Sequence, residues 1–254
     1  MIINSELIQP LHLVGDSTGC LLVHGFTSCP GDVRPLSKYL HSLGYTCRET
    51  LLPGHGASPE DMVKYGWRDW LQAVELELAQ LEIKCSRVWV LGFSMGGLLT
   101  LLAAARNGTA GLVSISAPIW PQAWRAKYAF LLQYFQKYAQ LGKPGQYHLP
   151  SWRYEQVAVK NVADLMALIK EGKRALRKIS VPAFVVQGRE DHTIKPRSAQ
   201  YIYDNLGSAQ KEIHYSRGGH MLLAGEQSEE ICRRIGEFIQ ERGGDVDGSC
   251  KTGG

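Results

Sequence analysis

The chain has 254 residues, of which 44% are hydrophobic and 20% charged, values close to globular averages that exclude wholesale disorder. A single α/β domain accommodates this length, so we expect one domain. The 28 basic and 24 acidic residues give a formal net charge of +4 but are interleaved along the chain, which argues against a surface that binds nucleic acid.

The sequence shows no segment that targets or inserts the chain into a membrane. No apolar run approaches the roughly 20 residues that span a bilayer, and residues 1–10 lack the apolar core of a secretory signal. We therefore expect a cytoplasmic protein without stable membrane insertion. The six cysteines are widely spaced and form no C-x-x-C pair, which predicts free thiols and no zinc site.

The first half of the chain alternates apolar runs of strand length with segments of helical period, a pattern typical of a parallel sheet wrapped by helices. The predicted strands cover residues 20–24, 45–52, 87–92 and 111–117, and the predicted helices cover 33–43, 70–81 and 95–107. Gly44 is predicted to end the first helix, and Asp69 to be the N-cap of the second. The pattern indicates an α/β fold.

After Pro118 this alternation stops for about 60 residues rich in Tyr, Trp and Gln. It resumes with strands at 183–187 and 211–215 and helices at 198–206 and 228–240. The interruption predicts an inserted cap at 119–178 between two parts of one core, 1–118 and 179–242. Residues 243–254 are rich in Gly and poor in apolar side chains, which predicts a flexible tail.

A G-x-S-x-G motif, Gly92-Phe93-Ser94-Met95-Gly96, lies between a predicted strand and a predicted helix. A strand that turns abruptly into a helix strains the middle residue, and this turn requires small residues two positions away on either side. Gly92 and Gly96 meet that requirement. The motif in this context predicts that Ser94 is a nucleophile.

A serine hydroxyl attacks well only when a base accepts its proton and an acid fixes the tautomer of that base. In proteins with this turn, the acid and then the histidine follow the serine along the chain. His220, after the last predicted strand, is therefore the expected base, whereas His24 precedes the serine and is expected to be structural. Asp191 and Glu190 are both candidates for the acid, and the shorter side chain of Asp191 favours it.

Stabilising an anionic tetrahedral intermediate requires two N–H donors close to the nucleophile. Phe26 follows the first long predicted strand, and Met95 lies at a helix N-terminus, where the helix dipole favours negative charge. We expect the backbone N–H groups of Phe26 and Met95 to bind the substrate's oxyanion.

Several segments resemble the small bacterial carboxylesterases and the similar bacterial monoacylglycerol lipases of the α/β-hydrolase superfamily. They are LLVHGFT, Leu52-Pro53-Gly54-His55-Gly56, Asp69-Trp70, residues 92–97, residues 182–191 and Gly219-His220. The resemblance covers residues 18–242. It implies a sheet of about seven or eight strands, a small helical cap, Asp191 as the acid, and neither a metal nor an organic cofactor.

The resemblance further implies that the chain hydrolyses a small carboxylic ester through an acyl-enzyme on Ser94. A monoacylglycerol lipase that acts on longer-chain glycerides is one alternative. A catalytically silent hydrolase-like binding protein is another, although the complete set of Ser94, Asp191 and His220 argues against it.

The predicted cap contains an aromatic and apolar stretch that is a candidate for a substrate pocket. Trp120 and Trp124 are the predicted substrate-binding residues within it. The stretch also includes Tyr128, Phe130, Leu131, Tyr134 and Phe135. The alternative interpretation is that these side chains only pack the cap together.

Overall fold

A seven-stranded sheet forms the centre of the computed structural model, which describes residues 5–106, 108–141 and 153–243. The strands lie in the order β1-β3-β2-β4-β5-β8-β9, and all neighbours are parallel except the edge strand β1, which is antiparallel to β3. Their bounds are β1 His12–Leu13, β2 Thr18–Val23, β3 Thr46–Thr50, β4 Arg87–Phe93, β5 Gly111–Ile115, β8 Ala183–Gly188 and β9 Lys211–Ser216.

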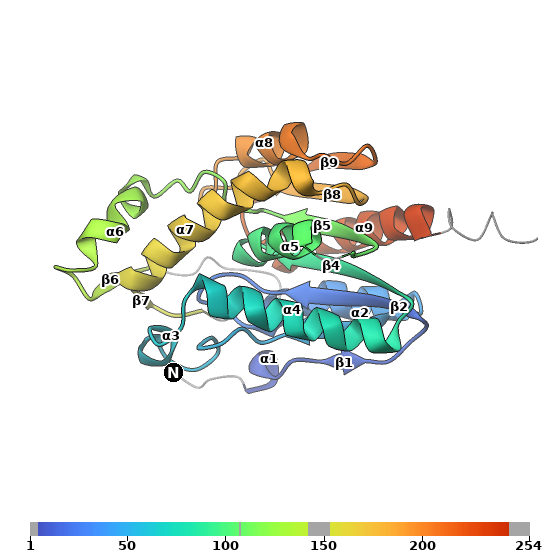
Figure 1. The fold of residues 1–254 in the computed structure, drawn as a ribbon, viewed down its shortest axis with the longest axis horizontal. Helices are drawn as coiled ribbons and strands as arrows, with labels where there is room; N and C mark the ends of the chain where they lie inside the picture. Colours follow the sequence, from blue (N-terminus) through green and yellow to red (C-terminus); the bar gives the residue numbers. More distant parts are fainter. Residues whose placement is uncertain (1–4, 107, 142–152, 244–254) are drawn as a thin grey trace, which may run out of the picture.

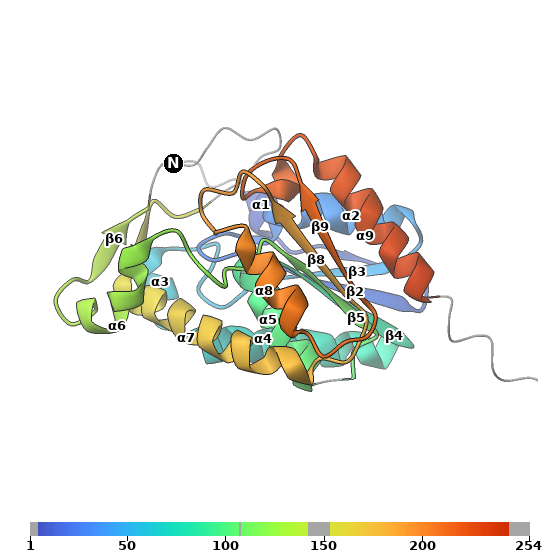
Figure 2. The ribbon, with the colours of Figure 1, turned by 90° about the horizontal axis from the view of Figure 1, so that it is seen from above.

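Helices cover both faces of this sheet (Figure 1, Figure 2). α2 and α9 pack on one face, and α4, α5, α7 and α8 pack on the other. The helices are α1 Ser5–Ile8, α2 Arg34–Ser42, α3 Pro59–Met62, α4 Trp67–Lys84, α5 Met95–Arg106, α6 Ala129–Leu132, α7 Val159–Ala175, α8 Arg197–Asn205 and α9 Ser228–Gly243.

The strand β2 shows why the apolar runs become buried strands. Successive side chains of a strand point to opposite faces of the sheet. Leu21 and Val23 therefore join the hydrophobic cluster under α4 and α5, whereas Cys20 and Leu22 join the cluster under α2 and α9. Both faces of such a strand are covered by helices, and neither offers a polar side chain contact with water. The sequence of the strand is therefore a continuous apolar run.

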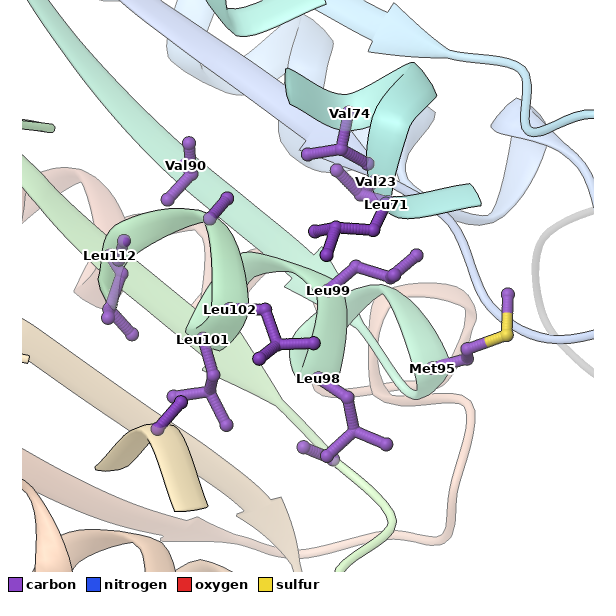
Figure 3. Packing of buried hydrophobic residues seen from close by; sticks show 14 of the residues in the cluster. Val23, Leu71, Val74, Val90, Met95, Leu98, Leu99, Leu101, Leu102 and Leu112 are labelled. Atoms are coloured by element: carbon purple, nitrogen blue, oxygen red, sulfur yellow. The ribbon is translucent and has the colours of Figure 1, made fainter. Parts of the chain in front are cut away.

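The helix α5 is buried on almost every side, from Met95 to Ala104. Its leucines cluster with side chains of the sheet and of α4, including Val90 and Val74 (Figure 3). The later part of α7 belongs to the same cluster through Leu168 and Ile169. A helix that is apolar all round requires such cover, and this packing fixes the helix that begins directly after Ser94.

The strands and helices expected in the core are present, but one predicted helix start is wrong. α4 begins at Trp67, with Gly66 as N-cap, so Asp69 is the third residue of the helix and not its N-cap. Its carboxylate accepts a hydrogen bond from the Gly66 backbone N–H at 2.7 Å, as an acidic residue at this position does in a capping box. Gly44 follows α2 with φ +101°, as expected for a residue that ends a helix.

Beyond the carboxyl ends of the strands, residues after β5 form a separate small layer (Figure 1). It contains a 3-10 helix at Trp124–Tyr128, α6, and an antiparallel pair of β6 Tyr138–Gln140 and β7 Gln156–Ala158. α7 then leads back onto the sheet face beside α5 (Figure 2). The division into core and cap at 119–178 stays a prediction.

Some predictions concern parts of the chain that the structure does not describe. The expected tail lies outside the described residues from 244 onwards, as does Cys250. The described cysteines are all buried free thiols. Within the described ranges, no helix combines the length and the apolar character needed to cross a bilayer.

Candidate active site

The serine of the G-x-S-x-G motif lies on a tight turn between β4 and α5. Ser94 has φ 54°, in the left-handed region that L-residues rarely adopt. A Cβ on Gly92 would lie 2.2 Å from the backbone oxygen of Gly96, and a Cβ on Gly96 would lie 2.1 Å from that of Val23. The Ser94 N–H donates to the Ile115 carbonyl at 2.8 Å and so ties the turn to β5. The chain packs too closely here for any residue larger than glycine at either position.

His220 lies in the loop after β9 and faces this serine. Its Nε2 is 3.0 Å from Ser94 Oγ, and its ring centre lies 5.2 Å from that of Phe93. The backbone carbonyl of His220 accepts hydrogen bonds from Leu222 N–H at 3.0 Å and from Ser116 Oγ at 3.3 Å. The loop is therefore held from two sides, which fixes the imidazole over the serine.

Asp191, three residues after the end of β8, completes the hydrogen-bonded chain. Its Oδ2 is 2.8 Å from His220 Nδ1 and also accepts from Gln187 Nε2 at 2.9 Å. Its Oδ1 accepts the backbone N–H groups of Thr193 and Ile194, each at 2.8 Å. Four donors thus satisfy a carboxylate that is only 2% exposed.

The surroundings of Asp191 keep it ionised. Burial is the largest influence and raises the pKa of Asp191, but the hydrogen bond and charge of His220 and two backbone N–H groups together outweigh burial, and the pKa lies below its ordinary value. Because a carboxylate only accepts, Nδ1 of His220 carries the hydrogen and Nε2 is left to accept the proton of Ser94. Glu190 is exposed, and its backbone N–H donates to the Gly218 carbonyl of the returning loop at 3.0 Å.

His24 holds the neighbouring loop in place and does not contact Ser94 through a hydrogen bond among those described. Its Nδ1 donates to the Gly25 carbonyl at 2.8 Å, and its Nε2 accepts the Leu52 N–H at 3.2 Å. Burial lowers the pKa of His24 to about 4. Burial and then the nearby His24 also lower the pKa of His55, whose ring lies 5.0 Å away. The lowered pKa values favour the neutral form of both rings, and the contacts of His24 agree with the structural role expected for it.

The loop after β2 approaches the serine closely. A Cβ on Gly25 would lie 3.3 Å from the Cβ of Ser94. The next residue, Phe26, lines the cavity beside Ser94, and its ring packs edge-on against Trp70 with centres 5.9 Å apart. Met95 is the first residue of α5, and its side chain is fully buried. This arrangement suits the two backbone donors expected at Phe26 and Met95, whose role in binding stays a prediction.

A cavity of about 630 Å³ opens over Ser94 and His220. One wall comes from β7 and the first half of α7, and it is apolar. Its residues are Val157, Val159, Val162, Leu165 and Met166. Sequence reasoning missed this wall, although Val159, Val162 and Met166 recur at steps of three and four, which predicts one face of a helix.

One of the two tryptophans expected to bind the substrate, Trp120, packs away from the cavity. Trp120 is not among the described residues that line the cavity; its ring packs against Tyr201 with centres 4.9 Å apart, and Lys173 and Arg197 lie over it. The substrate-binding role predicted for Trp120 gains no support from these contacts. The side chain of Trp124 lies outside the part of the chain that is described.

The apolar residues after Trp124 that are candidates for the pocket or for cap packing are not among the described residues that line the cavity. Tyr128, Phe130, Leu131, Tyr134 and Phe135 are exposed. The positions that face the cavity belong to smaller or polar neighbours, Ala129, Leu132 and Gln136.

In the described part of the chain, no three His, Cys, Asp or Glu side chains lie close enough to hold a metal ion. The independence of activity from metals stays a prediction.

The described residues thus place a serine, a histidine and a carboxylate in one hydrogen-bonded chain at the carboxyl ends of β4, β9 and β8. A mostly parallel sheet flanked by helices, with its serine on a strand-to-helix turn, defines the α/β-hydrolase class. The chain belongs to the family described as serine aminopeptidase, S33, whose model matches residues 16–228. The family resemblance and the fold class predicted from the sequence are confirmed.

Two characterised relatives are similar over nearly the whole chain. The carboxylesterase of Bacillus subtilis (strain 168) is 30% identical over 237 residues, which cover 92% of this chain and 96% of the relative. The thermostable monoacylglycerol lipase of Bacillus sp. (strain H-257) is 32% identical over 242 residues, covering 93% and 96%. The chain is a carboxylesterase homologue.

Solved structures support the same fold. A solved structure from work on LipS and LipT, two metagenome-derived lipolytic enzymes, matches this chain with a TM-score of 0.87 and 27% identity. The match covers 92% of this chain and 98% of that structure's chain. The monoacylglycerol lipase of Paleococcus ferrophilus matches with a TM-score of 0.79 and 17% identity, covering 92% and 99%.

Proposed function

We propose that this chain is a serine carboxylesterase in which Ser94, His220 and Asp191 form the catalytic triad. The observation that carries the proposal is the continuous hydrogen-bonded chain from Asp191 through His220 to Ser94, whose last two members line the cavity. The similarity to a carboxylesterase along nearly the whole chain supports the ester as substrate.

The first half of the reaction forms an acyl-enzyme. Ser94 Oγ attacks the ester carbonyl carbon while His220 Nε2 takes the hydroxyl proton. The carbonyl oxygen becomes an oxyanion, which the N–H groups of Phe26 and Met95 stabilise. Collapse of the intermediate breaks the bond to the alcohol oxygen, and that oxygen receives the proton from His220.

The second half releases the acid. A water molecule gives a proton to His220 and attacks the acyl carbon, and the second tetrahedral intermediate expels Ser94 Oγ, which takes the proton back. Asp191 stays ionised throughout and stabilises the imidazolium that forms twice in the cycle. Its four hydrogen-bond donors and its lowered pKa suit that role.

Hydrolysis of monoacylglycerols is the second candidate function. The wall of Val157, Val159, Val162, Leu165 and Met166 offers an acyl chain an apolar surface inside a cavity of about 630 Å³. The 32% identity to a thermostable monoacylglycerol lipase favours the same possibility. The two candidates share one mechanism and differ in the acyl length and the alcohol.

A panel of p-nitrophenyl esters from acetate to palmitate, assayed beside monoacylglycerols, tests the function and separates the two candidates. A short-chain esterase should hydrolyse the short esters with the highest kcat/KM, whereas a glyceride lipase should prefer long monoacylglycerols. Ser94→Ala should abolish hydrolysis of every substrate while the circular dichroism spectrum is kept.

A fluorophosphonate probe gives an independent check that the serine reacts. It should add mass at Ser94 in the native chain, and neither in Ser94→Ala nor in the heat-denatured chain. A native chain that neither reacts with the probe nor turns over any ester would support the alternative of a silent binding protein. Normal turnover by Ser94→Ala would contradict the assignment of the nucleophile.

A further inference from the structure

The outer face of α6 and of the turn after it exposes large apolar side chains. Phe130 and Leu131 are 57% and 52% exposed, and Tyr134 and Phe135 are 77% and 89% exposed. We refer to these four residues as the outer α6 face. Most of the exposed large apolar side chains in the described residues lie in the stretch from 128 to 135. Such a cluster indicates an interaction surface, because isolated exposed apolar residues are ordinary but contiguous ones are not.

The opposite side of the same segment already has a role. Ala129, Leu132 and Gln136 recur at steps of three and four and line the cavity. These positions border the cavity, whereas more than half of each side chain of the outer α6 face is exposed. The exposed side chains also lie next to residues that border the cavity, so whatever covers them lies close to the substrate's path.

The charge around the outer α6 face is entirely positive along the chain. From residue 117 to residue 141 the sequence contains Arg125, Lys127 and Lys137 but no Asp or Glu. All three cationic residues are exposed. The Lys127 ammonium lies 4.8 Å from the ring centre of Tyr128, and that of Lys137 lies 5.3 Å from the ring centre of Tyr138. The segment therefore combines aromatic rings with cationic side chains beside them.

We infer that the outer α6 face binds peripherally to the surface of an anionic phospholipid bilayer. Aromatic and aliphatic side chains enter the boundary between headgroups and acyl chains, and neighbouring lysines and arginines bind the lipid phosphates. In this pose the side of α6 that lines the cavity faces away from the lipid and towards Ser94. The cavity then opens next to the membrane surface, where esters with long acyl chains are dissolved.

A second copy of this chain is a poorer occupant of the same surface. In a two-fold symmetric dimer, the same patch lies on both sides of the interface. The exposed Lys127 and Lys137 of one copy would then approach the same cations of the other. An anionic surface complements this charge, whereas a second copy repeats it.

Vesicle co-sedimentation tests the inference. The protein is mixed with vesicles of phosphatidylcholine, or of phosphatidylcholine with about 30% phosphatidylglycerol, in about 0.1 M and about 0.5 M salt. We expect binding to the anionic vesicles in low salt and weak binding to neutral ones. Tyr134→Ser with Phe135→Ser should weaken the binding at least about tenfold. Lys127→Gln with Lys137→Gln should weaken it by about tenfold and remove most of its salt dependence.

Matched variants away from the outer α6 face control for loss of apolar area and of charge in general. Leu76→Ser with Ile83→Ser removes two side chains that are 58% and 85% exposed, and Lys84→Gln with Lys178→Gln removes two exposed charges. Neither pair should reduce vesicle binding. All variants should hydrolyse a water-soluble acetyl ester at the native rate, so a loss of binding with this rate kept separates the surface from the catalytic proposal.

Three results would overturn the inference. The first is native protein that stays in the supernatant with anionic vesicles in low salt. The second is binding that the variants of the outer α6 face leave unchanged. The third is a native dimer in sedimentation equilibrium that Tyr134→Ser with Phe135→Ser converts to a monomer, since the face would then join two copies of the chain.

Discussion

Asp191 and Glu190 are adjacent carboxylates in very different surroundings, which makes them a sharp pair to compare. Asp191→Asn should lower kcat by about 10⁴-fold, because an amide can hold the wrong tautomer of His220 and does not stabilise the imidazolium. Glu190→Gln should keep native kcat, since Glu190 is exposed. The measurement is kcat on a short p-nitrophenyl ester, with matched circular dichroism spectra. If Glu190→Gln had a strongly lowered kcat and Asp191→Asn kept a nearly native one, Glu190 and not Asp191 would be the acid of the triad.

Gly92 occupies a position at which the close approach of the backbone excludes a side chain. Gly92→Ala would place a Cβ 2.2 Å from the Gly96 carbonyl oxygen, and we expect it to lower the free energy of unfolding by about 3 kcal/mol. Gly108→Ala is the matched control, because nothing lies within 4 Å of a Cβ there. Urea unfolding of both variants measures the difference. Equal stability of the two would show that the turn after β4 can relax.

The buried His24 makes stability depend on pH. Its pKa falls from 6.5 to about 4 in the folded chain, so below the ordinary value the unfolded chain binds a proton that the folded chain does not. The stability contribution is complete above about pH 6.5 and is lost as the pH falls towards about 4. We expect urea midpoints to fall over this range, and less steeply in His24→Asn. A His24→Asn chain whose urea midpoint falls with the same slope as that of the native chain would refute the prediction.

At the scale of residues, the members of the hydrogen-bonded chain could be predicted from the sequence, but the groups that hold Asp191 in place by hydrogen bonds could not. Ser94 and His220 could be found because a local motif and the order along the chain mark them. The donors to Asp191 from Gln187, Thr193 and Ile194 have no such mark. Their role depends on the path of the loop after β8, and sequence spacing does not specify that path.

The helix α7 forms part of the cavity wall, and this leads to a prediction at the scale of the element. Met166→Trp should fill part of the cavity and lower kcat/KM for long acyl esters much more than for acetate. Lys170→Trp, on an exposed position of the same helix, should leave the preference unchanged. The p-nitrophenyl ester series measures both. An equal loss on every ester in Met166→Trp would show that this wall does not touch the acyl chain.

Long elements could be predicted from the sequence, whereas short elements and the orientation of α6 could not. β2, β4 and α5 have continuous apolar runs or a buried helical period, and those patterns require cover on both sides. α3 and α6 have four residues each, too few to show a period. The composition of the aromatic stretch around α6 makes it a candidate for a pocket, but composition does not specify which side of a short helix faces the cavity.

For the whole molecule, the sheet could be predicted and the cavity could not. The alternation of apolar runs and helical segments fixes a parallel sheet with helices on both faces. The cavity instead forms where segments far apart in the chain meet, among them Phe26, Val157 and Met221. Its volume and its open side depend on how the layer beyond β5 lies over the sheet. Local patterns contain no information on that placement.

α7 joins the wall of the cavity to the interior of the protein. Its first half lines the cavity, whereas Leu168 and Ile169 lie in the core, and a Cβ on Gly172 would meet Leu98 of α5 at 3.2 Å. One continuous helix therefore contacts both the cavity and the core. Local unfolding of α7 should involve both of its halves together. Filling the cavity with a covalent phosphonate should slow amide hydrogen exchange along the second half of α7, from Leu168 to Ala175, beyond the residues that line the cavity.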